Sequence, residues 1–163
     1  MAKGLCTDTE FWLWGGSHYT NIADEMLRSR VWQFLDGAVR PGKSGKQEPF
    51  KPSGGHVSNV SDAFKAVTQL DGGNPPFWIG GGEERPPATE LAAVGNGLLH
   101  LPTWTVRPAT PEFFGLNASE VIFDRNAAEP ALWKSFLRQV LEDQESIDLV
   151  QEWFGYTLTR DTS

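Results

Sequence analysis

Residues 92–108, AAVGNGLLHLPTWTVRP, contain the clearest strand pattern in the chain. The dipeptide Asn96-Gly97 is typical of a tight hairpin turn, because both residues tolerate positive φ. We expect an apolar strand over residues 98–101 and its partner over residues 104–107, joined through Pro102-Thr103. This stretch therefore predicts a small antiparallel sheet.

The N-terminal half alternates between hairpin, helix and loop signals. Residues 11–20, FWLWGGSHYT, predict a hairpin that turns at Gly15-Gly16, and Asn21 is the expected N-cap of a helix over residues 22–39. Proline and glycine predict flexible loops near residues 40–56 and 71–90, the second with a short strand or anchor at residues 77–79. A second helix is expected to start near residues 58–61 and to stop at Gly72-Gly73. The apolar faces expected on the two helices are formed by Leu27, Val31, Phe34, Leu35 and Ala38, and by Ala63, Phe64, Val67 and Leu70.

The last third of the sequence predicts two more helices. Pro130 fits a first helical position, and Gly155 is expected to close the final helix. Their apolar stripes are Leu132, Trp133, Phe136, Leu137, Val140 and Leu141, and then Ile147, Leu149, Val150, Trp153 and Phe154. The sequence thus predicts an α+β fold, with about four helices packed against a small antiparallel sheet and a helical C-terminal part.

Length and composition predict one soluble domain over residues 1–163. Hydrophobic residues make up 39% of the chain, and seven Trp and ten Phe provide a large core for this length. No apolar run approaches the roughly 20 residues that span a bilayer, and the N-terminus lacks a signal-peptide pattern. Cys6 is the single cysteine, so no internal disulfide forms, and we expect a protein of the reducing cytoplasm.

Charge is unevenly distributed along the sequence. The formal net charge is -7, yet residues 28–51 hold six basic and two acidic residues, a local charge of +4. Residues 112–163 hold four basic and ten acidic residues, a local charge of -6. The first segment could face a phosphate backbone and the second a basic partner, or both could be ordinary solvated faces.

The sequence predicts no catalytic, metal or cofactor site. Residues 42–47, GKSGKQ, resemble a phosphate-binding loop, but Arg40 stands where that motif needs glycine and Gln47 where it needs a hydroxyl. His18, His56 and His100 lie on three separate elements without ligand spacing. Ser17-His18 with Asp24 lacks a nucleophile elbow. A small hydrolase built around His18 or His56 stays open as an alternative.

Four cations mark a candidate nucleic-acid contact in the basic loop: Arg40, Lys43, Lys46 and Lys51. Nearby Trp12, Trp14 and Tyr19 could stack on bases, although aromatic side chains are more often buried. A solvated basic loop is the other interpretation.

The last 70 residues resemble the domain that precedes the superfamily-three helicase motor in phage and plasmid primases and in the poxvirus primase-helicase. Asn96-Gly97-Leu98-Leu99-His100-Leu101, followed by Pro108 and Pro111, is similar to its strand and proline pattern. Phe123-Asp124 with Ala127 and Pro130 is similar to "aromatic-Asp-x-x-Ala-x-x-Pro". Trp133, Phe136 and Leu137 match "W-x-x-F-L", and residues 155–159 match "G-Y-x-L-T". Two positions depart from the family pattern: His100 replaces its usual Asp, and Glu129-Pro130 its usual Cys-Pro.

The resemblance implies a non-catalytic accessory domain of a primase-helicase that acts in DNA replication. It would support helicase ring assembly or guide DNA. The motor, with its ATP and magnesium, is expected beyond Ser163, so the parent would be an ATP-dependent helicase or primase. Implied partners are that motor domain, further copies in a ring, and DNA through weak contacts. The alternative is a stand-alone module that binds single-stranded nucleic acid.

Overall fold

The computed structural model describes residues 4–7, 10–42, 45–70, 73–80 and 84–157. This part of the chain has an α+β fold with four α-helices and several small antiparallel sheets, which confirms the predicted fold class. The chain divides into two units, each with its own internal packing. Unit 1 comprises residues 1–15 and 19–74, and unit 2 comprises residues 16–18 and 75–163. That residues 1–163 act as one accessory domain stays a prediction.

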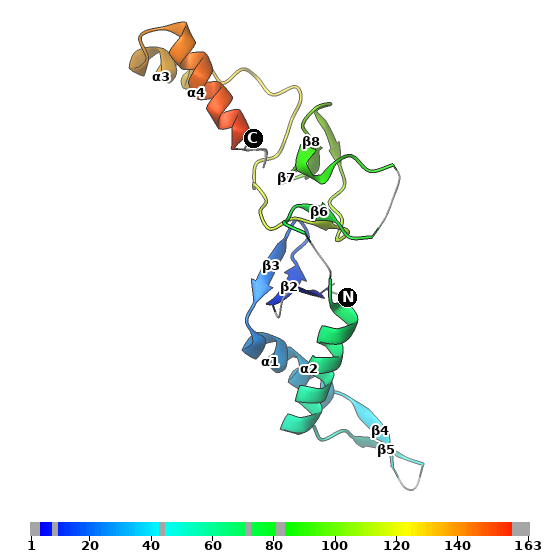
Figure 1. Ribbon diagram of the computed structural model, residues 1–163. Coiled ribbons are helices and arrows are strands. Elements are labelled where there is room, and N and C mark those ends of the chain that lie inside the picture. Colours follow the sequence, from blue (N-terminus) through cyan, green and yellow to red (C-terminus); the bar gives the residue numbers. More distant parts are fainter. Residues whose placement is uncertain (1–3, 8–9, 43–44, 71–72, 81–83, 158–163) are drawn as a thin grey trace. The chain divides into compact units, whose positions relative to one another are not determined.

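Unit 1 contains a three-stranded antiparallel sheet in which β2 (Glu10–Trp14) lies between β1 (Gly4–Thr7) and β3 (Tyr19–Ile22) (Figure 1). The predicted hairpin corresponds to β2 and β3, paired from Phe11↔Ile22 to Trp14↔Tyr19. Gly16 in its turn has φ +102°, which glycine adopts without steric penalty.

Helix α1 (Asp24–Asp36) begins later than the sequence predicts. Asn21 is not its N-cap, because Asn21 pairs with Trp12 and extends β3 through Ile22. Ala23 occupies the cap position and makes no side-chain cap hydrogen bond. Asp24 and Glu25 in the first turn still favour the positive end of the helix dipole.

The predicted loop at residues 40–56 is wrong in its details. Strands β4 (Val39–Pro41) and β5 (Gln47–Pro49) form an antiparallel hairpin, closed where the Gly42 amide donates to the Lys46 carbonyl at 2.8 Å. Pro41 is the last residue of β4 and Pro49 the last of β5, positions where a missing N–H is tolerated. Proline and glycine here therefore shape a hairpin instead of an irregular loop.

Helix α2 (Gly54–Thr68) also begins before its predicted start. Ser53 is its N-cap, and its hydroxyl accepts from the His56 amide at 3.4 Å, which compensates for two glycines in the first turn. Its buried residues are Val57 and Ser61, whereas Val67, predicted to face the core, is 81% exposed.

The core of unit 1 lies between the sheet and the two helices. Phe11 stacks on Phe64 of α2 with ring centroids 5.9 Å apart, and the Leu70 amide donates to the Cys6 carbonyl. One core cluster consists of the buried residues Cys6, Phe11 and Leu27, packed with Ile22, Val31 and Phe64.

Unit 2 contains the sheet predicted from residues 92–108. Strand β8 (Gly97–His100) lies between β7 (Leu91–Val94) and β9 (Thr105–Arg107), and a 3-10 turn, η1 (Ala88–Glu90), precedes β7. A separate pair joins β6 (Phe77–Trp78), at the expected anchor, to β10 (Phe113–Phe114), which the sequence analysis missed. The core consists of Leu91, Leu98 and Phe113, packed with Trp78, Ala88 and Ala93.

Unit 2 ends in two helices, α3 (Ala131–Val140) and α4 (Gln144–Tyr156). Pro130 directly precedes the first helical residue, one position before its predicted place. Within the described residues, no helix has both the length and the apolar character that crossing a membrane requires.

Candidate interaction surface

Two segments of the family-like pattern are joined by the side chain of Asn96. Its Nδ2 donates to the Phe123 carbonyl at 2.9 Å, and its Oδ1 accepts from the Phe123 amide at 3.0 Å. The Gly95 amide adds a bond to the Val121 carbonyl at 2.8 Å. Asp124 then accepts from the Asn126 amide at 2.8 Å, which stabilises the turn that follows. These residues connect the β7–β8 hairpin to the chain that leads into α3.

Helices α3 and α4 form an antiparallel pair. Trp133 lies in the first turn of α3 and Phe154 in the last turns of α4, and their rings meet edge to face at 5.6 Å. Leu137 and Ile147 are the buried residues of the two helices. The pair therefore buries little apolar surface of its own, although helices of this length depend on packing for their stability.

Half of the apolar stripe predicted for α3 is exposed to solvent. Leu132, Phe136 and Val140 repeat every four residues, and Leu132 is 89% exposed. On α4, Leu149, Trp153 and Tyr156 follow one another at spacings of four and three residues, and Trp153 is 62% exposed. We call the following set the aromatic surface: Leu132, Phe136, Val140, Leu149, Trp153, Phe154 and Tyr156.

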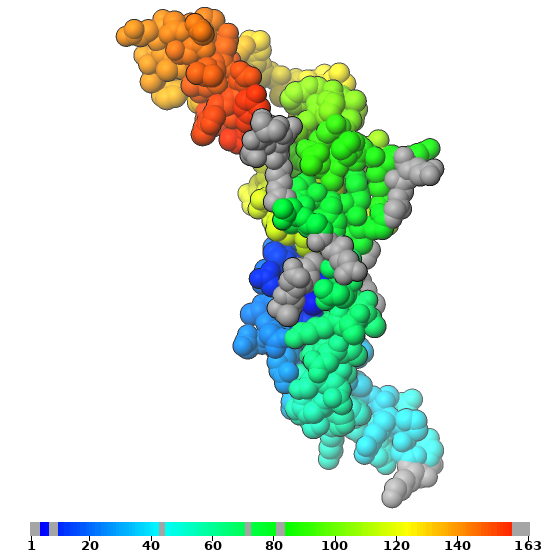
Figure 2. Space-filling view, viewed as in Figure 1, coloured from blue at the N-terminus to red at the C-terminus, as the bar shows by residue number. Residues whose placement is uncertain are grey.

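A row of ring contacts makes this surface continuous across both helices. Phe136 stacks on Trp133 at 5.9 Å, Trp133 meets Phe154, and Phe154 meets Trp153 at 5.4 Å. Figure 2 draws the two helices in orange to red, packed against each other. Exposed aromatic side chains in a contiguous group are typical of an interaction site.

Carboxylates surround the α4 part of the aromatic surface. Residues 142–156 contain five acidic residues and no Lys or Arg, and all five carboxylates are exposed. Glu145 lies one turn before Leu149, and Glu152 lies between Leu149 and Tyr156 on the same helical face. The surface therefore combines aromatic contacts with negative charge.

Asp143 fixes the start of α4. Its Oδ1 accepts from the Ser146 amide at 2.8 Å and its Oδ2 from the Ser146 hydroxyl at 2.9 Å. These hydrogen bonds to the ionised form lower the pKa of Asp143 below the 3.8 of an unperturbed Asp. The carboxylate thus stays charged at the positive end of the helix dipole.

The predicted nucleic-acid residues lie on and beside the β4–β5 hairpin. Arg40, Lys46 and Lys51 are exposed, and Lys43 lies outside the described residues. Arg40 is register partner of Glu48, with its guanidinium 3.9 Å from that carboxylate. Lys46 directly precedes β5, and Lys51 follows it. Their contact with nucleic acid stays a prediction.

The aromatic residues considered for base stacking belong largely to the hairpin β2–β3. Tyr19 is fully buried and its ring lies 5.2 Å from that of Trp14; burial raises the pKa of its phenol to about 12. Trp12 and Trp14 are half-buried. Tyr19 is therefore a core residue and is not accessible to a base.

The three histidines have local partners on three separate elements. His18 lies 2.9 Å from Ser17 Oγ, and His56 lies 3.0 Å from Ser53 Oγ. Asp24, imagined as the orienting acid for His18, instead pairs with Lys65 at 3.2 Å. Among the described residues, no three His, Cys, Asp or Glu side chains are grouped as metal ligands would be.

His100 has the most extensive polar contacts, which the sequence analysis did not foresee. Its Nε2 lies 3.1 Å from Glu90 Oε2, and its Nδ1 lies 2.7 Å from Thr103 Oγ1. Thr103 Oγ1 in turn lies 2.8 Å from Thr105 Oγ1. This network spans the β8–β9 turn and joins it to Glu90, which precedes β7.

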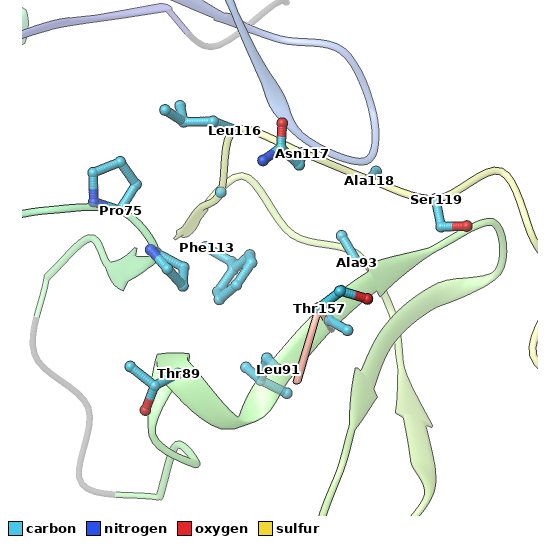
Figure 3. A pocket seen from close by; sticks show the side chains of 13 residues that line it. Pro75, Thr89, Leu91, Ala93, Phe113, Leu116, Asn117, Ala118, Ser119 and Thr157 are labelled. Carbon is cyan, nitrogen blue, oxygen red and sulfur yellow. The ribbon is translucent and has the colours of Figure 1, made fainter. Parts of the chain in front are cut away.

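Unit 2 also has an open cavity of about 520 Å³ (Figure 3). Phe113 and Leu91 line it beside Asn117, Ser119 and Thr157, and all the lining side chains are uncharged. Charged groups that would attract an ionic ligand are therefore absent from this lining.

Comparisons of the chain with protein-family models, with curated proteins and with solved structures found no match.

Proposed function

We propose that this chain is a non-catalytic accessory domain of a phage- or plasmid-derived primase-helicase in DNA replication, and that its aromatic surface docks onto the helicase motor. The observation that carries the proposal is the continuous row of ring contacts on α3 and α4, in which Phe136, Trp153 and Phe154 are exposed. Trp133, Phe136 and Leu137 of the family-like pattern lie on α3. Docking there would support helicase ring assembly or DNA guidance, with ATP and magnesium bound by the motor.

The test is binding of this chain to the helicase motor domain encoded in the same genome, measured by isothermal titration calorimetry. Phe136→Ser and Trp153→Ala should each weaken binding at least tenfold, because exposed aromatic anchors dominate interface energies. Val67→Ala removes an even more exposed apolar side chain from α2 and should leave binding unchanged. Absence of motor binding would refute the proposal, as would clear thermal stabilisation of the isolated chain by ATP.

The second candidate is a stand-alone module for single-stranded nucleic acid, which the exposed cations of the β4–β5 hairpin favour. It predicts oligonucleotide binding that weakens steeply with salt, measured by fluorescence anisotropy. Replacing both Lys46 and Lys51 by Gln should lower the affinity and the salt slope together. If no oligonucleotide binds at low salt, this second function is dismissed.

A further inference from the structure

Charge and shape together indicate which chemistry the aromatic surface fits. The surface consists of two apolar ridges, Leu132–Phe136–Val140 on α3 and Leu149–Trp153–Tyr156 on α4. An amphipathic partner helix can bury its apolar face along the connected rings of Phe136, Trp133, Phe154 and Trp153, because apolar residues at spacings of three and four form ridges that fit the ridges of a facing helix. A partner helix would also bury apolar surface that the pair leaves exposed, since only Leu137 and Ile147 of the two helices are buried.

The carboxylates of α4 restrict the flanks of such a helix. Glu145 and Glu152 share the helical face of Leu149 and Tyr156, and both are exposed. On α3, the Lys134 ammonium lies 3.0 Å from the Glu129 carboxylate, and Arg138 is the other cation of that helix. Acidic flanks on a partner would be repelled, and basic flanks would be attracted.

We propose that the aromatic surface binds an amphipathic helix whose apolar face is flanked by Lys or Arg. This inference rests on the docking role proposed above and adds the chemistry of the segment that docks. The apolar side chains of the partner supply affinity through burial against Phe136, Phe154 and Trp153. The carboxylates supply selectivity, since charges at the rim of an interface act more on partner choice and association rate than on affinity.

The experiment uses two synthetic 18-residue helical peptides with one set of Leu and Trp at helical spacing. One has Lys at every flanking position, and the matched peptide has Glu there. Binding to the full chain is followed by fluorescence anisotropy of a labelled peptide. The Lys peptide should bind at least about tenfold more tightly than the Glu peptide, and added salt should narrow that ratio. Equal affinities would overturn the inference.

Variants locate the effect on the helix pair. Trp153→Ala should lower the affinity for the Lys peptide at least tenfold. The double substitution Glu145→Lys with Glu152→Lys should remove or invert the preference for the Lys peptide over the Glu peptide. Glu10→Lys with Glu120→Lys changes the net charge equally through exposed residues outside α3 and α4, and should preserve the preference. Far-ultraviolet circular dichroism checks that α3 and α4 remain folded in each variant. If the Lys peptide binds but Trp153→Ala has no effect, the peptide binds elsewhere and the inference fails.

The two proposals fail in different ways. If the chain binds the motor but does not prefer the Lys peptide, the proposed accessory function stands and the inference of a basic partner helix fails. If the Lys peptide binds selectively at Trp153 but the motor does not bind, the inference of an acidic docking surface stands and the proposed helicase function fails.

Discussion

Gly97 at the start of β8 has φ +145° and lies close to β9. An added Cβ there would overlap the carbonyl oxygen of Arg107 and lie 2.9 Å from Val106 Cγ1. Gly97→Ala should therefore destabilise unit 2 by at least about 2 kcal/mol through backbone strain and steric overlap. Urea unfolding followed by tryptophan fluorescence measures this loss.

Gly155→Ala is the matched control, because Gly155 lies inside α4 and a Cβ there meets no atom within 4 Å. Alanine should stabilise the helix by about 0.5–1 kcal/mol, since glycine loses more backbone entropy on folding. Equal destabilisation by both substitutions would contradict the assignment of strain to Gly97.

Asp143 gives α4 a defined pH dependence. Its pKa is lowered in the folded chain, so its ionised form stabilises α4 above the unfolded pKa, near 3.8, and this contribution is lost as pH falls through the folded pKa. Asp143→Asn retains a good N-cap but cannot ionise. The native helix should be more stable than the variant at pH 7, and the difference should vanish at low pH. Circular dichroism melts across this range provide the measurement, and a difference independent of pH would contradict the role of ionisation.

At the scale of elements, His100 couples the β8–β9 turn to the residues before β7. An Asp at this position would place a second carboxylate beside Glu90, whose Oε2 lies 3.1 Å from His100 Nε2. His100→Asp should therefore destabilise unit 2 by about 1 kcal/mol at pH 7 through repulsion and the lost contact. Denaturant unfolding gives the magnitude.

A double-mutant cycle separates repulsion from other effects of the substitution. Glu90→Gln in the His100→Asp background should recover most of the lost stability, because the like charges are no longer opposed. If Glu90→Gln gives no recovery, then Glu90 is not the partner that makes His preferable to Asp here.

Elements with a strong local pattern could be predicted, and those set by tertiary pairing could not. Asn96-Gly97 indicated the position of the β7–β8 hairpin because turn chemistry is local, although the turn itself is Gly95-Asn96 and Gly97 already pairs with Val94. Asn21 was misassigned as a cap because its pairing with Trp12 is visible only once β2 is placed. The two residues of β10 are too short to show a period, and their strand exists because Phe113 and Phe114 pair with β6.

The candidate surface could be predicted only in part, for a related reason. Helical periodicity identified Phe136 and Trp153 as members of apolar stripes but could not tell a buried stripe from an exposed one. The stripe predicted on α3 has six residues, and Leu137 is the only one of the six that is buried. Which stripe residues stay exposed depends on how α3 and α4 contact each other, and that contact includes the rings of Trp133 and Phe154.

At the scale of the whole molecule, the two units have separate cores. Cys6, Phe11 and Leu27 form a core cluster in unit 1, and Leu91, Leu98 and Phe113 form another in unit 2. Cooperative unfolding requires shared buried contacts, so separate cores predict that each unit can open without the other. The substitutions that test this prediction are therefore one core leucine in each unit.

Leu27→Ala should lower the unfolding free energy of unit 1 by roughly 2–4 kcal/mol, because Leu27 is 7% exposed and its truncation leaves a cavity. Native-state hydrogen exchange should then show faster exchange in α1 and α2 and unchanged protection in β7 and β8. Leu98→Ala is the reciprocal variant and should have the opposite pattern. Accelerated exchange throughout both units in either variant would mean that they unfold as one. Independent opening would also bear on docking, because a partner bound at α3 and α4 would then stabilise unit 2 alone.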